Sequence, residues 1–476
     1  MIGTNKRLGV YAATAGFVLM VFELAAARLL APTIGSSMYV WTSVIGIIVM
    51  ALSLGFWYGG RIADMRHRLL DISLLFGAIS ASIVMMLVIG DALLESLSTS
   101  DMDARLKAVI ASLVLFAPTS FFTGMVSPYL AKLNVTSLKT SGRAIANLDA
   151  LNSIGGIFGT FLAGFVLFGY FGVREVIITL AITSAIMSWS IAPREQTNKR
   201  LVATGFLALL ILLSGQSTDA QAIDTPTMHY SIERHQTGVE TQVHLTTGPM
   251  ASQSGIILGR PDELIFWYTQ QMARIVEEKS IEAGDKILVL GGGAYTLPRY
   301  LAEKYPEAQI DVVEIDPELI QIAREHFEYN DPKNVTSYAV DARAYVNTTK
   351  EQYDVVLVDV FSHDQTPFTF VTKEYGQAMR RIIKPDGIVA VNIIAGSEGA
   401  CREVLDASLA PFLANFAQGA VLFRAPEASS SNIMAAFGPT GWEVPDGYML
   451  AMDGGQKIFT DNFAPTERLA STCRSY

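Results

Sequence analysis

The chain contains little cysteine and little net positive charge, and each shortage argues against a class of protein. Only two of its 476 residues are cysteines, Cys401 and Cys473, which is too few for a disulfide framework. Their spacing is not that of metal ligands, so the sequence predicts no metal site and leaves the redox compartment open. The formal net charge of −10 argues against nucleic acid as a partner.

Charged residues make up only 17% of the chain, whereas 50% of the residues are hydrophobic. This composition is too apolar for a uniformly water-soluble protein. The apolar excess lies almost wholly before residue 216, and most of the charges follow it. We therefore predict a transmembrane domain at 1–216, a linker with a small β subdomain at 217–260, and a water-soluble domain at 261–476.

The first domain contains six long apolar runs and a seventh that is shorter. A helix needs about 20 apolar residues to cross the hydrocarbon layer, and the six runs reach or approach this length. They lie at 8–31, 39–58, 69–89, 109–130, 151–171 and 176–191. The seventh run, 201–213, has the layout of a signal-peptide core or an interfacial helix, so we predict six or seven membrane helices.

Basic residues set the predicted orientation of these helices. They occur at Lys6 and Arg7, and then in alternate loops within 61–68, 132–143 and 194–200. By the positive-inside rule these loops are cytoplasmic. If 201–213 crosses the membrane, the soluble domain lies outside the cytoplasm; if it lies flat or re-enters, the domain lies inside.

Two ionisable residues in the first run, Glu23 and Arg28, are candidates for more than anchoring. A charge inside a membrane is costly unless it is paired or faces a polar cavity. The sequence leaves both interpretations of Glu23 open. Further on, Gly155, Gly156 and Gly159 have the small-residue spacing that lets membrane helices pack closely.

The soluble domain contains a nucleotide-binding pattern. A buried-strand run at 287–290 meets Gly291, Gly292 and Gly293, and one helix later a second strand ends in Glu314. Glycines let the backbone approach a ligand, and a carboxylate at the second strand end can accept both hydroxyls of a ribose. Because the spacing is not that of the dinucleotide fingerprint, an S-adenosyl compound fits better than NAD.

Strands and helices alternate after this point, which predicts a Rossmann-like, doubly wound parallel sheet. A small β-hairpin precedes it, with strands at 230–234 and 240–246. The later strands end in Asp341 and Asp359, so these two carboxylates, Glu314 and the glycines are expected to meet in one crevice. A lone Asp at such a place is more simply a helix cap, and Asp316 before Pro317 is assigned that role.

Four stretches of the soluble domain resemble the polyamine aminopropyltransferases, the spermidine synthases. They are Ile287-Leu-Val-Leu-Gly-Gly-Gly293, Val313-Glu-Ile-Asp-Pro317, Tyr353-Asp-Val-Val-Leu-Val-Asp359 and Ile383-Lys-Pro-Asp-Gly387. The segment Val360-Phe-Ser-His-Asp-Gln-Thr-Pro367 and the layout of the chain resemble bacterial membrane proteins with a spermidine synthase-like domain behind a hydrophobic half. The resemblance covers about 228–400.

The resemblance implies a transferase of polyamine biosynthesis in the bacterial inner membrane. Its substrates would be S-adenosylmethionine or decarboxylated S-adenosylmethionine and a small-molecule amine acceptor, with 5′-methylthioadenosine as product and no metal. The lipid membrane is then a partner, nucleic acid is not, and a homodimer is left open.

The resemblance also implies roles for individual residues. Gly291, Gly292, Gly293 and Glu314 would hold the adenosine, Asp341 with the adjoining Ala342 would read the adenine, and Asp359 would be the base. Gln253 and Tyr268 fall near family positions that contact the nucleoside and the aminopropyl chain.

The chain departs from the family at two places on the amine side. Ala294 replaces an Asp that holds the transferred aminopropyl ammonium. Ser362 replaces the second Asp of an acceptor-binding pair, and Asp364, two residues on, is the candidate substitute. Two alternatives therefore stay open: a methyltransferase, and a transporter or sensor gated by an adenosyl compound or polyamine.

Overall fold

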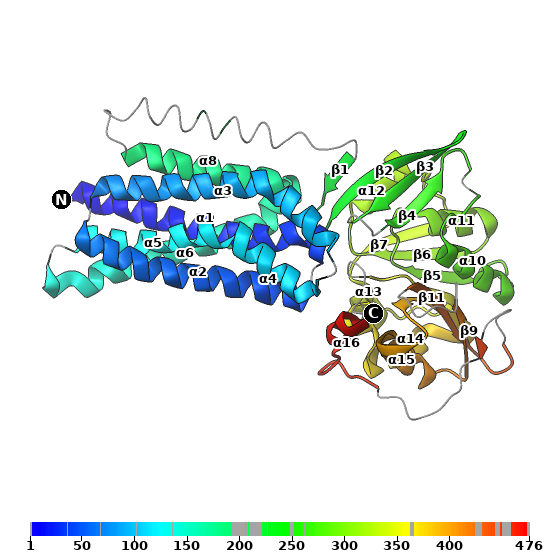
Figure 1. Ribbon diagram of the computed structural model, residues 1–476. Helices are drawn as coiled ribbons and strands as arrows, with labels where there is room; N and C mark the ends of the chain where they lie inside the picture. Colours follow the sequence, from blue (N-terminus) through cyan, green and yellow to red (C-terminus); the bar gives the residue numbers. More distant parts are fainter. Residues whose placement is uncertain are drawn as a thin grey trace. The chain divides into compact units, whose positions relative to one another are not determined.

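The computed structural model divides the chain into two compact units (Figure 1). Unit 1 comprises residues 1–219 and 224–226, and unit 2 comprises 220–223 and 227–476. The structure describes residues 2–191, 205, 208 and 221–473, except 36, 67, 101, 136, 226, 248–251, 261, 362–365, 424–430, 443–447 and 450–457.

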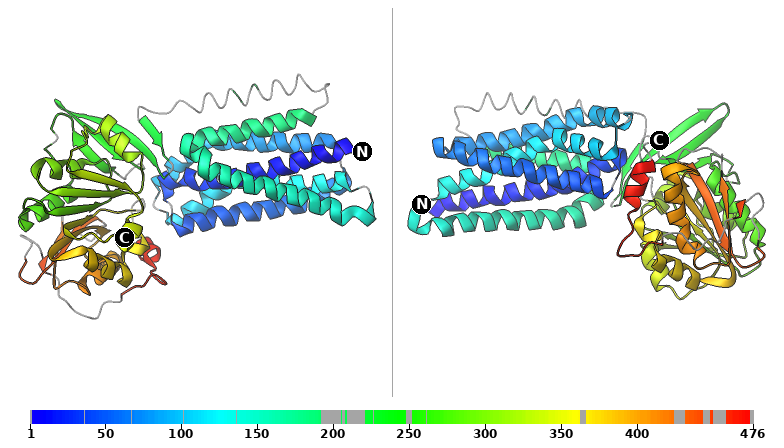
Figure 2. Two further views of the ribbon diagram at one scale, coloured as in Figure 1. Left: turned by 180° about the vertical axis from the view of Figure 1, so that it is seen from behind. Right: turned by 60° about the horizontal axis from the view of Figure 1, so that its bottom comes forward.

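Long helices run side by side in unit 1 (Figures 1 and 2). Within the described residues, five helices are long and apolar enough to cross a membrane, or six if one bent pair is a single span. The helices are α1 (Ile2–Ile34), α2 (Met38–Met65), α3 (Leu69–Ser98), α4 (Ala104–Leu115), α5 (Ala117–Asn134), α6 (Ser141–Leu162), α7 (Phe168–Tyr170) and α8 (Val173–Ile191). A 3-10 turn, η1 (Leu138–Thr140), precedes α6, and a π-helical turn, η2 (Ala163–Leu167), follows it.

The fourth apolar run is not the single helix that the sequence predicts. It breaks at Phe116, and its two parts, α4 and α5, meet at a bend of 51°. Pro118 stands in the first turn of α5, where its missing N–H is tolerated but would interrupt a continuous helix. The seventh run, 201–213, lies outside the described residues apart from two positions.

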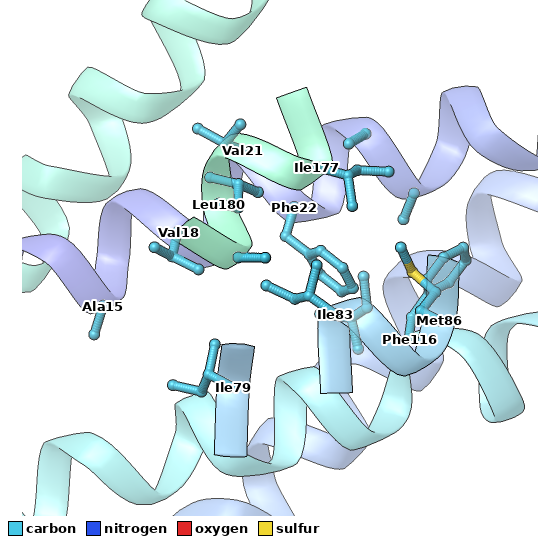
Figure 3. Packing of buried hydrophobic residues seen from close by; sticks show 14 of the residues in the cluster. Ala15, Val18, Val21, Phe22, Ile79, Ile83, Met86, Phe116, Ile177 and Leu180 are labelled. Carbon is cyan, nitrogen blue, oxygen red and sulfur yellow. The ribbon is translucent and has the colours of Figure 1, made fainter. Parts of the chain in front are cut away.

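Small residues bring pairs of helices in unit 1 into close contact. A Cβ on Gly155 of α6 would lie 1.9 Å from the carbonyl oxygen of Ala13 in α1, and one on Gly124 of α5 would lie 2.5 Å from that of Leu52 in α2. The sequence interpretation of tight packing at Gly155 is therefore confirmed. Larger apolar side chains fill the space between α1, α3, α8 and the α4–α5 break (Figure 3).

Glu23 and Arg28 do not form an ion pair within the described part of the chain. The Arg28 guanidinium lies over the ring of Phe168, 4.5 Å from its centroid. Positions five apart on a helix do not face each other, which accounts for the missing pair. The pairing interpretation is therefore wrong for these two residues.

Unit 2 begins with a four-stranded sheet in the order β1-β2-β3-β4. Its strands are β1 (Gln221–Asp224), β2 (His229–Thr237), β3 (Glu240–Thr246) and β4 (Ser252–Ile257). The predicted hairpin is present as β2 and β3, with a tighter turn at Gly238, where φ is +66°. The sequence did not predict β1 and β4, which extend the hairpin to a sheet.

A larger, eight-stranded sheet follows in the order β12-β10-β11-β9-β8-β5-β6-β7. Its strands are β5 (Lys286–Leu290), β6 (Gln309–Glu314), β7 (Val335–Ala339), β8 (Tyr353–Val358), β9 (Ile383–Ala395), β10 (Gln418–Phe423), β11 (Ser431–Gly438) and β12 (Tyr448–Met449). Strands β5 to β9 are parallel, and the order reverses at β5, as predicted for a doubly wound sheet. Strand β11 pairs antiparallel with β9, and β10 pairs antiparallel with both β11 and β12, so the sheet is mixed and not wholly parallel.

Helices cover both faces of the larger sheet. Its two apolar clusters pack against α10 and α11 on one face and against α13, α14 and α15 on the other. The helices are α10 (Trp267–Lys279), α11 (Thr296–Lys304), α12 (Leu319–His326), α13 (Ala342–Thr348), α14 (Lys373–Ile382), α15 (Gly399–Leu413) and α16 (Thr466–Cys473), with a short turn η4 (Phe368–Phe370).

Two helices begin later than the sequence predicts. An early proline at 261 followed by two acidic residues predicts a helix over 261–278. The helix α10 begins instead at Trp267, and Phe266 before it is extended, with ψ at 137°. The helix expected from Pro317 begins at Leu319, and its N-cap is Glu318 rather than Asp316. Cys401 in α15 and Cys473 in α16 form a disulfide, a pairing that their 72-residue separation did not indicate.

Candidate active site

The glycine turn after β5 is closed around the carboxylate of Glu314. The backbone N–H groups of Gly292 and Gly293 donate to Glu314 Oε2 over 2.9 and 3.2 Å. Gly291, with φ at +92°, lies so close to the next strand that a Cβ would be 2.2 Å from the Asp359 carbonyl oxygen. Gly291 is thus required for both a positive φ and close backbone approach, and Gly293 also has a positive φ, at +50°.

Glu314 accepts a third backbone hydrogen bond, from the N–H of Asp316 to Oε1 over 3.0 Å. Burial raises the pKa of Glu314 above the usual value, and the three backbone donors oppose that shift. The carboxylate therefore stands at the strand end predicted for a ribose-binding group, held by the backbone that the ligand would approach.

Asp316 has a different environment from the helix cap assigned from sequence. Its Oδ1 accepts the N–H of Glu318 over 3.0 Å, which supports the turn before α12. The side chain is 1% exposed and also bonds to the hydroxyl of Tyr230. Burial first, and the carboxylates of Asp316 and Glu314 next, raise the pKa of Tyr230.

Strand β4 approaches the glycine turn from the smaller sheet. Ser254 Oγ accepts the N–H of Ala294 over 3.0 Å. The Ala294 side chain is fully buried in an apolar cluster that includes Ile232, Leu319 and Phe327. A carboxylate placed in this cluster would lose its hydration. Ala294 therefore fits its surroundings better than the Asp that the resemblance to the spermidine synthases implies at this position.

Asp359 follows β8 and has a polar neighbour on the next strand. The parallel register pairs Val358 with Val391, which places Asp359 beside Asn392. Asn392 Nδ2 donates to Asp359 Oδ1 over 2.9 Å. Burial raises the pKa of Asp359 to about 6, the Asn392 hydrogen bond lowers it, and the Glu314 carboxylate raises it further.

Tyr268 and Gln253 lie together on the same side of the site. The Tyr268 hydroxyl donates to the backbone carbonyl of Gln253 over 2.7 Å. Burial raises the pKa of Tyr268, and the Asp359 carboxylate adds to that effect, so the phenol stays protonated. The structure thus brings Tyr268 near Asp359.

Asp341 is the N-cap of α13, the role that the sequence favours for an isolated aspartate. Its Oδ1 accepts the N–H of Ala344 over 2.8 Å, and Ala342 is the first residue of the helix. Ile315 follows Glu314 at the end of β6, and Val340 follows Ala339 at the end of β7. The register pairs Glu314 with Ala339, so Ile315 and Val340 lie at neighbouring strand ends, where they are 54% and 42% exposed. They offer an apolar surface between two carboxylates, which suits a flat heterocycle.

The two predicted acceptor-binding residues, Ser362 and Asp364, lie outside the described residues. Sequence reasoning missed Asn392, Ser254 and Tyr230. Asn392 lies within the buried part of β9 and not at its end, so the rule that selected the other strand ends does not find it. The signal that could have marked it is a polar side chain inside an otherwise apolar run. Ser254 and Tyr230 come from the smaller sheet, and no local pattern marks them.

The geometry brings groups suited to adenosyl binding and proton transfer together at the carboxyl ends of the parallel strands. The residues that meet there are Gly291, Gly292, Gly293, Glu314 and Asp359, with Tyr268 and Asn392 beside Asp359. In the part of the chain that the structure describes, no three His, Cys, Asp or Glu side chains are grouped so as to hold a metal ion.

Comparisons with known proteins match this same segment. Residues 265–394 match the family model described as "Spermine/spermidine synthase domain". The chain therefore carries a domain of this kind in its C-terminal part, and the segment from Gly291 to Asn392 lies within it.

Curated relatives include two kinds of transferase. A polyamine aminopropyltransferase of Vibrio vulnificus is 32% identical over 117 residues, which cover 24% of this chain and 39% of that protein. A probable polyamine aminopropyl transferase of Bifidobacterium longum is 31% identical over 130 residues, which cover 27% and 29%. A mouse eEF1A lysine and N-terminal methyltransferase is 29% identical over 137 residues, which cover 27% and 19%. The chain thus spans well under half of the length of these relatives.

A solved structure with a similar chain is a probable spermidine synthase from Corynebacterium glutamicum. The two share 24% identity with a TM-score of 0.43, over 52% of this chain and 99% of that one.

Proposed function

We propose that unit 2 is an aminopropyltransferase-like enzyme that transfers an alkyl group from an S-adenosyl sulfonium to an amine and releases 5′-methylthioadenosine. The observation that carries this proposal is Asp359, a partly buried carboxyl at a strand end whose pKa is raised to about 6. A base with a pKa near the working pH is suited to general base catalysis. The match of residues 265–394 to a spermine/spermidine synthase domain supports the assignment.

The proposed step is a displacement at the carbon next to the sulfonium. The amine lone pair forms the new C–N bond, and the C–S bond breaks with its electron pair going to sulfur, which becomes a neutral thioether. The nitrogen then carries a positive charge and an extra proton, which passes to the Asp359 carboxylate. Alignment and one base can suffice because the sulfonium is already a good leaving group.

The donor would be held by the glycine turn and the strand ends next to it. Glu314 would accept the ribose hydroxyls, and Ile315, Val340 and Asp341 would surround the adenine. Ala294 is buried and gives no carboxylate for an aminopropyl ammonium. Both decarboxylated S-adenosylmethionine and S-adenosylmethionine are therefore donors to test.

The remaining assignments concern partners and location. Ser362 and Asp364 are proposed to contact the acceptor amine, and Gln253 and Tyr268 the nucleoside and the transferred chain. Unit 1 is proposed to cross a lipid membrane, specifically the bacterial inner membrane, since five or six of its described helices are long and apolar enough. A homodimer is compatible with this arrangement, and nucleic acid is not a proposed partner.

Methyl transfer is the second candidate because eEF1A lysine and N-terminal methyltransferases are among the relatives. The same adenosyl site would then bind S-adenosylmethionine, and the product would be S-adenosylhomocysteine. The two reactions leave different nucleosides, so one assay separates them.

The experiment is a product assay with the full-length protein in detergent. Each donor is incubated with a panel of amines, and 5′-methylthioadenosine and S-adenosylhomocysteine are separated by chromatography. We expect 5′-methylthioadenosine from the wild type and none from Asp359→Asn. Asp406→Asn, in an exposed helix pair with Arg402, is the matched control and should keep full activity.

Each other outcome has a defined meaning. S-adenosylhomocysteine as the product would establish methyl transfer instead. Nucleoside binding without either product would reject both reactions and favour a transporter or sensor that binds an adenosyl compound. Full activity in Asp359→Asn would remove Asp359 as the base.

A further inference from the structure

The segment 224–226 is held against the helices of unit 1. It belongs to that unit, although the chain on either side of it belongs to unit 2. Arg28 Nη1 in α1 donates to the backbone carbonyl of Thr225 over 3.3 Å, and the Asp224 carboxylate attracts the same guanidinium. A Cβ on Gly172 would lie 2.2 Å from Asp224 Oδ2, so this carboxylate stands beside the residue that precedes α8.

These contacts lie at one end of the helices, and the chain leaves α8 at the other end. Arg28 is near the Ile34 end of α1, and Gly172 is next to the first residue of α8. At 1.5 Å per residue α8 is about 28 Å long, close to the thickness of the hydrocarbon layer. The chain leaves this helix at Ile191 and reaches Asp224 beside its opposite end. The residues between Ile191 and Asp224 must therefore pass from one end of α8 to the other.

Basic residues distinguish the two ends of the helices. Successive helices alternate in direction, so their connections lie at the two ends in turn. The connections at the Ile34 end, 35–37, 99–103 and 171–172, contain no lysine or arginine. Those at the Ile191 end include Arg66, Arg68 and Lys139, and Lys6 and Arg7 stand at the same end. By the positive-inside rule the Ile191 end is cytoplasmic, so 224–226 lies on the other side.

We propose that the chain crosses the membrane between Ile191 and Asp224, and that unit 2 works on the outer face, outside the cytoplasm. The inference rests on the membrane location proposed for unit 1, and it extends the proposed function by assigning it to one side. The apolar run 201–213 lies in this interval. A run shorter than the hydrocarbon layer can still cross, because the bilayer thins locally and flanking side chains extend to its surface.

The disulfide of unit 2 gives independent support. Cys401 and Cys473 are bonded, and both are buried. Such bonds form and persist in oxidising compartments and are rare in the cytoplasm, where thiols are kept reduced. An outer location of unit 2 accounts for this bond.

The side of unit 2 also determines what must precede its reaction. The sulfonium donor carries a fixed positive charge, which is costly to place inside a bilayer, so the donor does not cross unaided. A donor formed in the cytoplasm must therefore be delivered by a transport step. Transfer to the amine then follows on the outer face.

The side is tested by labelling added cysteines in the full-length protein, produced in bacteria and probed in spheroplasts. Lys350→Cys places an exposed thiol in unit 2, whereas Thr99→Cys and Ser137→Cys place one at each end of the helices of unit 1. The probe is a maleimide that does not cross membranes, applied to intact spheroplasts and to spheroplasts opened with detergent. The wild type measures the background from its two native cysteines.

We expect Lys350→Cys and Thr99→Cys to be labelled equally before and after opening, and the labelling of Ser137→Cys to be lost in intact spheroplasts. If Lys350→Cys follows Ser137→Cys instead, the inference is overturned, while the membrane location and the transferase activity stand. Equal labelling of Thr99→Cys and Ser137→Cys in intact spheroplasts overturns the membrane location, and the inference falls with it. Should Lys350→Cys fail to accumulate, Lys333→Cys, also exposed in unit 2, is measured in the same way.

Membrane vesicles of both orientations separate the side of unit 2 from its reaction. S-adenosylmethionine or its decarboxylated form is supplied outside the vesicles with a panel of amines, and 5′-methylthioadenosine is measured. Right-side-out vesicles should form the product, and inverted vesicles should lose this activity until detergent opens them. Product from intact inverted vesicles alone overturns the inference. No product even after opening overturns the proposed reaction, and the side of unit 2 is then decided by the labelling.

Discussion

At the scale of the residue, the position of Asp359 determines both its basicity and the effect of its charge on the stability of the folded state. The carboxyl lies at the carboxyl end of β8, between the Asn392 amide and the buried phenol of Tyr268. Burial disfavours its charged form, so the pKa rises to about 6. The same property that suits a base for catalysis therefore works against the ionised, folded state.

The first prediction concerns the pH dependence of activity. Because Asp359 accepts a proton only when it is ionised, kcat/KM for amine transfer should rise with pH and reach half of its maximum near pH 6. The measurement is the initial rate of 5′-methylthioadenosine release between pH 5 and 8, at an amine concentration corrected for the neutral form. A flat profile would contradict the assignment of Asp359 as the base.

The second prediction concerns stability at the same residue. The folded-state pKa of Asp359 is raised from an ordinary value of 3.8, so the native state binds this proton more tightly than the unfolded state. The contribution of Asp359 to the free energy of unfolding is therefore fully present below about pH 4 and is lost as the pH rises through 6. Above pH 6, the loss amounts to up to about 3 kcal/mol.

Asp359→Asn removes that ionisation. We expect the free energy of unfolding of the variant to exceed that of the wild type at pH 8 and the two to converge at pH 4, measured by denaturant titration of the full-length protein. Equal pH dependence in both proteins would show that Asp359 is not destabilised by burial.

At the scale of the element, the turn between β5 and α11 brings the site together. Gly291 takes a positive φ and lies against the Asp359 carbonyl, and the next two N–H groups donate to Glu314. One turn therefore positions both the proposed ribose acceptor and the backbone of the proposed base.

The third prediction tests this turn with two alanines. Gly291→Ala and Gly284→Ala both place a side chain at positive φ, +92° and +87°, but only at Gly291 does the new Cβ meet another atom. Gly284→Ala should cost about 1–2 kcal/mol of unfolding free energy and keep activity. Gly291→Ala should cost more and also abolish turnover, because the Asp359 backbone must move. Equal effects of the two variants would argue against the close approach.

At the scale of the whole molecule, the disulfide joins helices that are far apart in sequence. Cys401 in α15 bonds to Cys473 in α16 across 72 residues. Cross-links that close loops of this length stabilise proteins by about 2–5 kcal/mol. Such bonds persist mainly in oxidising compartments outside the cytoplasm.

The fourth prediction is that this bond is present in the isolated protein. Alkylation without reductant followed by mass spectrometry should leave both cysteines unmodified, and reduction should lower the free energy of unfolding by about 2–5 kcal/mol. Cys401→Ser should remove the effect of reductant. Complete alkylation without reductant would contradict the prediction.

The state of this bond in cells also bears on the orientation of the chain. If the described helices form six spans, they return the chain at Ile191 to the side on which it began. An oxidised pair in cells would then require 201–213 to cross, whereas a reduced pair would keep unit 2 on the cytoplasmic side, where basic loops are expected. Thiol labelling of intact cells separates the two.

The sequence by itself determined most of the apolar helices, the parallel strands and the main candidates of the site. Apolar runs of about 20 residues predict the membrane helices, and buried-strand runs that end in glycine or a carboxylate predict β5, β6 and β8 with Glu314 and Asp359. These signals are local, because a run of side chains along one element reports its burial and its end. The sequence also predicts a helix over 342–348 after Asp341, and α13 has these bounds.

Tertiary structure decided what depends on neighbours distant in the chain. The sequence did not predict the break at Phe116, the antiparallel pairing of β10, β11 and β12, or the Cys401–Cys473 bond. It also left open whether Glu23 pairs with Arg28. Asn392 became a candidate only when the register placed it beside Asp359. The physical reason is that hydrogen-bond partners and pKa shifts depend on distances between strands, and the sequence of one strand does not contain them.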